Sequence, residues 1–398
     1  MRYQLIIVKR WIEDIIMFPL IWWGRMLAWR HPLEGHYEIF FFFSFYHIGG
    51  AEKVHASIAK ALRHEKGIIF FTRTSHNDLF LEDFKASGHR IIDISRFTDN
   101  KWMYWKNIIY RGLISGYINS QPGKKIVFNG QSNFGYKLSR WINRDIPQIE
   151  LIHSLSNFSY IRIPFLPFYR STIMISKNRI DDHMALYKRY GIPEKYPDKI
   201  EYIINGISLP DNPVPRQFTG KELSLLYVGR DTPEKRVHLV RDIAGASRKA
   251  GLPVTLTYTG DVSSVIPKTD EARFYGNVGV EKQMDEIYRA SDVLLITSSE
   301  EGFPMVVMEA MARGCIILAT PVGDIPLHIQ SGINGFLLSQ VSNEPMIVED
   351  AVKIIKKMLA DPDLCAFISA MNIKYAAEHF GLVTFEKNYQ ELFDNYLY

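Results

Sequence analysis

From Tyr37 onward the chain repeats one pattern, in which a short apolar run stops at a turn residue and a stretch of helical periodicity follows. The first example is EIFFFFSFYHIGG, which predicts a buried strand and a glycine turn. The next segment, AEKVHASIAKALRHEKG, predicts an amphipathic helix with Gly67 as its C-cap. Alternation of strand and helix predicts parallel sheets with right-handed crossovers. We therefore expect an α/β fold of two Rossmann-like domains that face each other across a cleft.

Further candidate strands share this short apolar character. In the first half of the chain they are GIIFFTR, HRIIDIS, KKIVFNG, QIELIHS, TIMISK and KIEYIING. In the second half they are ELSLLYVG, PVTLTYTG, ARFYGN, DVLLITS and CIILATP. Helical periodicity between them predicts helices at 234–249, 281–290 and 304–313.

Length and a proline-rich break predict the domain boundaries. A chain of 398 residues exceeds the size at which one hydrophobic core usually stops growing. Pro210, Pro213 and Pro215 mark a linker. The predicted parts are a helical segment at 1–34, an amino-terminal Rossmann-like domain at 35–208, the linker at 209–219, a carboxy-terminal Rossmann-like domain at 220–380, and a terminal helix at 381–398 that packs back on the amino-terminal domain.

Composition sets the class of protein. Apolar residues make up 47% of the chain and charged residues 23%, which argues against a disordered chain. The net charge of +4 is too small to indicate a nucleic-acid binder by itself. Two cysteines, Cys315 and Cys365, cannot form a disulfide framework or a cysteine-based metal site. We expect a cytoplasmic protein.

The amino-terminal segment 1–34 combines tryptophans with cations. Its longest uncharged run, Ile15 to Gly24, has ten residues, whereas a membrane-spanning helix needs roughly 20. It also lacks the order of charges and the cleavage site of a signal peptide. Pro19 predicts a division into two helical pieces. Two interpretations stay open: a helix lying on the membrane surface, or a helical hairpin used for packing or self-association.

The most informative stretch is DVLLITSSEEGFPMVVMEAMARGCIILATPVG. It predicts a strand ending at Ser298, then a polar loop, then a helix with Pro304 in its first turn. The N-terminus of such a helix lies at the carboxyl edge of the sheet, where free N–H groups favour a phosphate. Glu301 precedes the helix and Glu309 lies within it, so two carboxylates can accept hydrogen bonds from separate hydroxyls of one ligand. Solvated helix charges are the alternative explanation of two such glutamates.

This stretch resembles the signature of retaining glycosyltransferases of family 4, whose motif is Glu, seven residues, Glu. Three further segments follow the family's order: HIGGAEK, YIINGIS, and YVGRDTPEKRVHLV with its Gly-Arg-x-x-x-x-Lys element. The matching residues are Gly49, Gly50, Asn205, Gly206, Gly229, Arg230, Lys235, Glu301 and Glu309. The resemblance covers roughly 37–398. It implies the two-domain GT-B fold, with 35–208 as the acceptor domain and 220–380 as the nucleotide-sugar domain. It also implies a nucleotide-sugar donor and transfer with retention at the anomeric carbon.

The resemblance also implies residue roles. Arg230 and Lys235 would stabilise the leaving diphosphate in place of a metal. Glu301 would bind hydroxyls of the transferred sugar and Glu309 those of the ribose. Gly49 and Gly50 would let the backbone approach the diphosphate. The remaining expected site residues are His153, as a contact to the donor sugar, and Gly229, Gly302, Phe303, Pro304 and Met305 around the donor.

Two departures from the family pattern concern the sugar pocket. Asp324 follows ATPVG where a second glycine is usual, and Leu327 stands where many members have Glu. Neither bears on the expected fold. No metal or other cofactor is expected, because the single Asp-x-Asp match, Asp361 to Asp363, is predicted to be a turn between two helices.

The stretch 101–144 contains eight Lys or Arg and no Asp or Glu, interleaved with aromatic residues. Three interpretations are open: a site for anionic lipid or a pyrophosphate-linked acceptor, an ordinary solvated face, or single-stranded nucleic acid. The lipid interpretation ranks first, and no nucleic-acid partner is expected because nothing else resembles such a module.

The sequence thus predicts a retaining, metal-independent glycosyltransferase of polysaccharide biosynthesis. It would move a hexose or N-acetylhexosamine from a nucleotide-sugar, with UDP as the expected nucleotide, to a lipid-linked or cell-surface glycan. Its place would be the cytoplasmic face of the cell membrane. A nucleotide-sugar 2-epimerase of the same fold and a non-catalytic nucleotide-binding scaffold are the alternatives.

Overall fold

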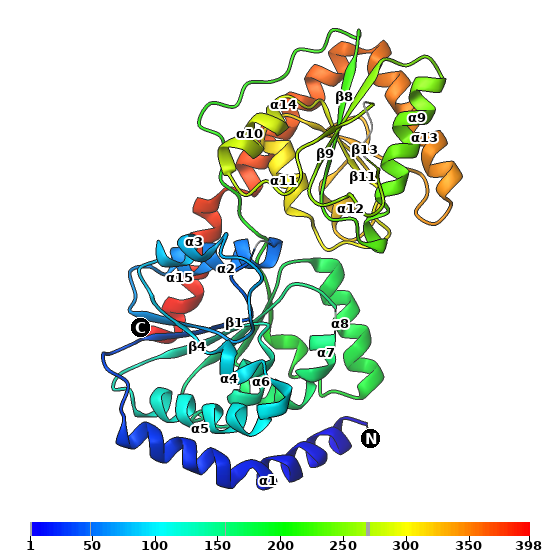
Figure 1. Cartoon of the computed structure of the whole chain (residues 1–398). Helices are drawn as coiled ribbons and strands as arrows, with labels where there is room; N and C mark the ends of the chain where they lie inside the picture. The colour runs from blue at the N-terminus through cyan, green and yellow to red at the C-terminus, as the bar shows by residue number, and fades with distance from the viewer. Residues whose placement is uncertain (1, 48, 156, 268–270) are drawn as a thin grey trace. The chain divides into compact units, whose positions relative to one another are not determined.

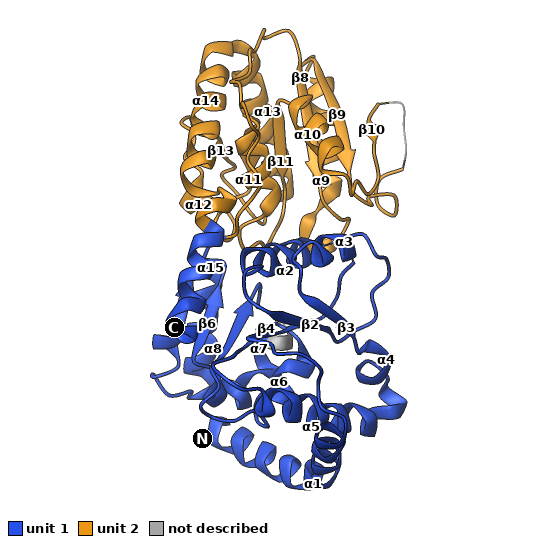
Figure 2. Ribbon diagram, turned by 90° about the vertical axis from the view of Figure 1, so that its left-hand side faces the viewer, with its two compact units in different colours: residues 1–204, 385–398 blue, residues 205–384 orange. Residues whose placement is uncertain are grey.

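The computed structural model describes residues 2–47, 49–155, 157–267 and 271–398. Its chain forms two compact units, coloured separately in Figure 2. Unit 1 consists of residues 1–204 and 385–398, and unit 2 of residues 205–384. Ile48, in the quoted HIGGAEK segment, lies outside the described residues.

Unit 1 contains a parallel sheet of seven strands in the order β3-β2-β1-β4-β5-β6-β7. The strands are β1 (Ile39–Phe43), β2 (Gly67–Phe71), β3 (Arg90–Asp93), β4 (Ile126–Gly130), β5 (Gln148–Ile152), β6 (Ser171–Met174) and β7 (Ile200–Tyr202). The helices are α1 (Arg2–Arg30), α2 (Gly50–Ala61), α3 (Leu81–Lys85), α4 (Ser95–Thr98), α5 (Tyr104–Ser120), α6 (Asn133–Ser139), α7 (Asn157–Ile161), α8 (Lys177–Tyr190) and α15 (Leu382–Leu397). Three short 3-10 helices are η1 (Lys101–Met103), η2 (Ile163–Phe168) and η3 (Pro197–Lys199).

The aromatic run of β1 explains why this sheet is covered on both faces. Successive strand residues point to opposite faces, so Phe40 and Phe42 pack with residues of α5 and α6. Phe43 points to the other face and stacks on His55 of α2 at 4.5 Å. Helices α2 and α5 accordingly lie on opposite sides of the sheet (Figure 1). Helix α15 lies on the same face of the sheet as α2, and the side chain of its Gln390 donates a hydrogen bond to the carbonyl of Ala61 of α2 at 3.0 Å.

Helix α1 forms an additional layer outside α5 (Figure 1). The two helices approach closely through glycines, since a Cβ on Gly112 would lie 2.0 Å from the carbonyl oxygen of Ile21. The predicted break at Pro19 is wrong, because α1 runs through it without interruption. Pro19 removes one helical hydrogen bond, but the carbonyl of Ile15 that loses its partner belongs to an exposed residue and can bind water.

Unit 2 contains a parallel sheet of six strands in the order β10-β9-β8-β11-β12-β13. The strands are β8 (Leu223–Val228), β9 (Val254–Thr259), β10 (Arg273–Phe274), β11 (Val293–Ile296), β12 (Ile316–Ala319) and β13 (Phe336–Leu337). The helices are α9 (Val237–Lys249), α10 (Glu281–Arg289), α11 (Met305–Ala312), α12 (Ile325–His328), α13 (Glu344–Ala360) and α14 (Pro362–His379), with η4 (Pro233–Lys235) as a 3-10 turn.

Several predicted boundaries are corrected. Helix α2 ends before Leu62, and Gly67 is not its C-cap but the first residue of β2. A Cβ on Gly67 would lie 2.6 Å from Nδ1 of His89, so close packing explains the glycine. Strand β11 ends at Ile296 rather than Ser298, and Pro304 is the N-cap of α11. The sequence did not predict β13, whose two residues are too few to show a period.

Candidate functional site

The candidate site lies at the carboxyl edge of the unit 2 sheet. Strands β8 and β11 are neighbours, while the chain continues from β8 to β9 on one side and from β11 to β12 on the other. Such a switch point is where open α/β sheets bind ligands. The loop after β8 carries Gly229, Arg230 and Lys235, and the loop after β11 carries Glu301.

Lys235 and Glu301 form the centre of this site. Nζ of Lys235 lies 2.5 Å from Oε1 of Glu301, and the hydroxyl of Ser298 donates to the same oxygen at 2.7 Å. The side chains are only 25% and 10% exposed, so the attraction is screened less than on an open surface. The hydroxyl of Thr297 donates to the carbonyl of Lys235 at 3.0 Å and joins the two loops. The spacing in the sequence did not predict Ser298 or Thr297.

Arg236 holds the two loops in this arrangement. Its backbone has φ 45°, a left-handed conformation that is costly for a residue with a Cβ. Its buried guanidinium donates to the carbonyls of Thr297 at 2.8 Å and Ser298 at 3.0 Å. The strained turn therefore places Lys235 beside Glu301. Nothing in the sequence distinguished Arg236 from an ordinary surface arginine.

Two glycines that the sequence analysis did not select allow the loops to approach each other. A Cβ on Gly323 would lie 2.2 Å from the carbonyl oxygen of Gly302, and one on Gly260 would lie 2.0 Å from that of Gly229. Both have positive φ, which favours glycine. The backbone N–H of Asp324, the residue that replaces the usual second glycine of the family, donates to the carbonyl of Gly302 at 2.8 Å. Asp324 therefore contacts the predicted site through its backbone.

Helix α11 carries the second carboxylate. Glu309 is partly exposed, and its Oε2 accepts a hydrogen bond from the hydroxyl of Tyr288 at 2.8 Å. Burial and the nearby Glu309 carboxylate raise the pKa of Tyr288, which therefore stays a neutral donor. Before the helix, Phe303 is buried and stacks on His328 at 4.2 Å. Pro304 and Met305 at the helix start are partly exposed.

The predicted site residues of unit 1 lie at the carboxyl edge of its own sheet. Gly49 and Gly50 mark the start of α2, where the carboxylate of Glu52 occupies the place of a Cβ on Gly49. His153 directly follows β5. Its Nε2 lies 2.8 Å from Nε2 of His55 on α2, a partner that the sequence analysis missed. Burial lowers the pKa of His153 to about 4, so the ring is neutral near pH 7.

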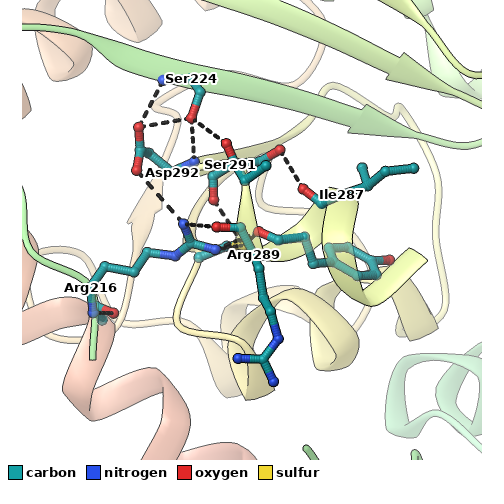
Figure 3. Close-up of polar contacts among 10 residues, drawn as sticks. Arg216, Ser224, Ile287, Arg289, Ser291 and Asp292 are labelled. Atoms are coloured by element: carbon teal, nitrogen blue, oxygen red, sulfur yellow. Dashed lines mark hydrogen bonds and ion pairs between the residues drawn. The ribbon is translucent and has the colours of Figure 1, made fainter. Parts of the chain in front are cut away.

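At the opposite edge of the unit 2 sheet, a polar pocket of about 270 Å³ includes Ser224, Ser291 and Asp292 in its lining. Figure 3 shows the adjoining polar contacts, in which Asp292 accepts from the backbone N–H of Ser224 at 2.9 Å. Arg216 of the linker donates to the carbonyl of Arg289 at 2.9 Å. Because these residues lie at the amino ends of the strands, we interpret the cluster as an anchor for the linker rather than as a substrate site.

The described ranges contain no group of three or more His, Cys, Asp or Glu that could hold a metal ion. No helix in them is both long and apolar enough to span a membrane. The predicted turn from Asp361 to Asp363 is corrected: only Asp361 lies between α13 and α14, where it caps α14 by accepting from Leu364 N at 3.0 Å, and Asp363 belongs to the first turn of α14.

Comparison with known proteins supports the assignment of the candidate site to the carboxyl edge of the unit 2 sheet. Residues 211–380 match the model of the family described as glycosyl transferases group 1. Alpha-maltose-1-phosphate synthase of Mycolicibacterium smegmatis is 27% identical over 256 residues, covering 58% of this chain and 59% of that protein. Lipopolysaccharide 1,2-N-acetylglucosaminetransferase of Salmonella typhimurium is 30% identical over 156 residues, covering 35% of this chain and 40% of that protein. The chain thus spans less than two thirds of the length of either relative.

Among solved structures, Anabaena HepE in complex with UDP and glucose matches with a TM-score of 0.68 at 16% identity, over 90% of this chain and all of that one. The fold is therefore GT-B, as predicted from the sequence. The residues that match the group 1 glycosyl transferase model include the Lys235 and Glu301 loops. The Glu-seven-Glu resemblance is consistent with this match.

Proposed function

We propose that the protein is a retaining glycosyltransferase that moves a sugar from a nucleotide-sugar to a glycan hydroxyl. The observation that carries the proposal is the Lys235 and Glu301 pair at the switch point of a group 1 glycosyl transferase domain. The expected donor is a UDP-hexose or UDP-N-acetylhexosamine. Support for this choice comes from HepE, whose structure holds UDP and glucose.

In the proposed reaction, the acceptor hydroxyl attacks the anomeric carbon from the side of the leaving diphosphate. A new C–O bond forms as the bond from carbon to the diphosphate oxygen breaks, and the hydroxyl proton moves to the departing phosphate. Arg230 and Lys235 stabilise the charge that develops on this leaving group. Glu301 accepts hydrogen bonds from the transferred sugar, and Glu309 accepts them from the ribose. With two cations in this role, the proposal includes no metal.

The proposed acceptor is a lipid-linked or cell-surface glycan. The Salmonella relative, named as a lipopolysaccharide N-acetylglucosaminetransferase, supports a glycan acceptor. Helix α1 supports a membrane surface, since it presents Trp11, Trp22, Trp23 and Trp29 to solvent, each more than half exposed. Its exposed charged residues are Arg2, Lys9 and Arg30, all cations. We propose the cytoplasmic face of the cell membrane as the place where the protein acts.

The cations of the basic stretch 101–144 differ in their exposure to solvent. Arg111 is fully buried and donates to Asn107, while Arg140 pairs with Asp14 of α1 at 3.2 Å. Only Lys101, Lys124 and Arg144 are exposed. Any contribution of this stretch to lipid binding would come from these three, so α1 is the main proposed membrane element.

A thermal-shift and hydrolysis screen tests the donor assignment. Purified protein is mixed with UDP-, GDP-, ADP- and dTDP-sugars, each with and without EDTA, because a ligand that binds only the folded state raises its Tm. We expect a selective shift with UDP-sugars that survives EDTA, and slow release of UDP. Arg230→Ala should lose both effects, since its cation contacts the diphosphate in the proposal. Arg241→Ala, an exposed arginine paired with Asp242 on α9, is the matched control.

The epimerase and scaffold alternatives give different outcomes with the same panel of donors. An epimerase would convert the donor sugar without an acceptor, and nuclear magnetic resonance of the donor, added to the screen, detects this conversion. A scaffold would shift its Tm with a nucleotide yet release none from any sugar. No shift with any nucleotide would contradict the proposed function.

A further inference from the structure

The two histidines at the carboxyl edge of unit 1 form a pair with one shared proton. Nε2 of His153 and Nε2 of His55 are 2.8 Å apart, and their rings meet edge to face with centroids 4.8 Å apart. Two imidazole nitrogens at this distance require one to carry a hydrogen and the other to accept it. The pair therefore couples the tautomer of one ring to that of the other.

The surroundings of His55 indicate which nitrogen is the donor. Nδ1 of His55 is buried and makes no hydrogen bond to any other described residue. Buried N–H groups without a partner are rare in folded proteins, which favours an unprotonated Nδ1 on His55. His55 then carries its hydrogen on Nε2 and donates it to Nε2 of His153. As a consequence, His153 must carry its own hydrogen on Nδ1.

Packing keeps His55 in place. Phe43 stacks on its ring at 4.5 Å, and a Cβ on Gly130 would lie 2.7 Å from its Nε2. Gln131, which has φ 60°, accepts a hydrogen bond from the backbone N–H of His153 at 3.4 Å. Strained residues of this kind at a strand end are concentrated at functional sites. Helix α2 and the ends of β1, β4 and β5 thus hold the pair.

We propose that His55 is a positioning residue that fixes His153 as the neutral Nδ1–H tautomer, so that His153 offers a hydrogen-bond donor to an oxygen of the sugar substrates. This inference rests on the proposed function and specifies what His153 contributes to it. His153 is partly exposed, and its Nδ1 has no hydrogen-bond partner elsewhere in the described chain. Sugar hydroxyl and phosphate oxygens both accept from an N–H donor.

The charge state of the pair supports this assignment. Burial lowers the pKa of both rings, and the neighbouring His153 lowers that of His55 further. A protonated His55 would place a charge in a site where no described carboxylate contacts it. Both rings are therefore neutral near pH 7, and the donor on His153 comes from its tautomer rather than from a positive charge.

The first test measures the tautomer directly. Nitrogen resonances of histidine distinguish protonated from unprotonated ring nitrogens, and the His153 signals are assigned in protein labelled with nitrogen-15 histidine by their loss in His153→Asn. We expect hydrogen on Nδ1 of His153 in the unchanged protein. His55→Leu removes the donor and should move the hydrogen to Nε2 or give a mixture. His55→Gln retains an N–H donor at a similar reach and should preserve the Nδ1–H tautomer.

The second test compares activity in the same variants with the donor identified by the screen above. His55→Leu should lower kcat/KM about tenfold, the loss of roughly one hydrogen bond to a polar substrate. His55→Gln should restore most of this loss, and the affinity for the free nucleotide should stay unchanged in both. His89→Gln is the matched control, because His89 is also buried in unit 1 and bonds the carbonyl of Ala59 at 2.9 Å.

The outcomes separate this inference from the proposed function, because the resonance measurement does not depend on activity. Hydrogen on Nε2 of His153 in the unchanged protein would overturn the inference. So would a His55→Leu variant with the same tautomer or the same kcat/KM as the unchanged protein. Failure of the proposed function would instead appear as the absence of any nucleotide-dependent Tm shift.

Discussion

Glu301 accepts hydrogen bonds from Lys235 and Ser298 on one carboxylate oxygen. Glu301→Gln keeps the size of the side chain and removes its charge. We expect kcat to fall about 100-fold, the scale of losing one electrostatic contact to the transition state, while KM for the donor changes less than about threefold because the nucleotide contacts remain. Steady-state transfer with the identified donor measures both constants.

Glu300→Gln is the control for this variant, since Glu300 is the exposed neighbour in the same loop. It should retain the kcat of the unchanged protein. A Glu301→Gln variant with unchanged kcat would remove Glu301 from the site. An equal loss in both variants would show that the loop, and not this carboxylate, was disturbed.

At the residue scale, the sequence identified residues that each belong to a recognisable continuous motif. Lys235 and Glu301 were both predicted in this way, each from the motif in its own loop. Their supporting partners could not be predicted, because contacts such as Ser298 to Glu301 or His55 to His153 involve common residue types with no characteristic spacing. Such contacts arise only when the sheets bring strand ends together.

At the scale of single elements, α1 shows how one helix serves two surfaces. Its buried positions include Ile21, Gly24 and Ala28, and the small residues allow the close approach to α5. The ion pair between Arg10 and Asp14, at 3.1 Å, is also almost completely buried. The opposite side exposes large apolar residues, including Ile16 at 73% and Trp29 at 84%. The helix therefore packs on the protein and still presents an apolar face.

This face predicts binding to anionic vesicles. Replacing Ile16 and Trp29 together, as Ile16→Ser with Trp29→Ala, should weaken partitioning at least tenfold, since burial of each large side chain contributes roughly 1.5–3 kcal/mol. Added salt should also weaken binding, because the exposed charges of α1 are cations. Sedimentation with vesicles of phosphatidylglycerol and phosphatidylcholine, against phosphatidylcholine alone, measures both effects.

Val383→Ser is the control, because Val383 is 83% exposed on α15 and should not affect partitioning. If the unchanged protein does not bind either vesicle, the membrane proposal fails. A dimer in solution that the double α1 variant converts to a monomer would instead support the self-association alternative.

The sequence predicted most elements of both sheets because their strands are short apolar runs with clear ends. It failed where tertiary packing overrides a local rule. Pro19 normally ends a helix, yet α1 runs through it, with Met17 before it and Ile21 after it packed in the cluster of Ile108 and Trp141. Gly67 was taken for a helix end, whereas its lack of a Cβ accommodates His89 across the sheet.

At the scale of the whole molecule, buried histidines of unit 1 predict a loss of stability in acid. His183 donates from Nδ1 to the carbonyl of Arg179 at 2.7 Å and lies 3.0 Å from the hydroxyl of Ser159. Burial, helped by the Arg162 guanidinium, lowers the pKa of His183 from 6.5 to about 4. Between these two values the unfolded chain binds a proton that the folded chain does not. The stabilisation is therefore fully present above pH 6.5 and is lost as the pH falls toward 4.

The free energy of unfolding of unit 1 should accordingly fall on going from about pH 7 to about pH 5, with His183 contributing on the order of 2 kcal/mol. Tryptophan fluorescence during urea unfolding reports on unit 1 alone, because all seven tryptophans lie between Trp11 and Trp141. His183→Asn keeps a donor for the Arg179 carbonyl but cannot titrate, so its unfolding free energy should depend less on pH by about that amount. An identical pH dependence in the variant would show that titration of His183 does not cause the loss of stability in acid. The acid sensitivity of unit 1 would then have to come from other groups, such as the His55 and His153 pair.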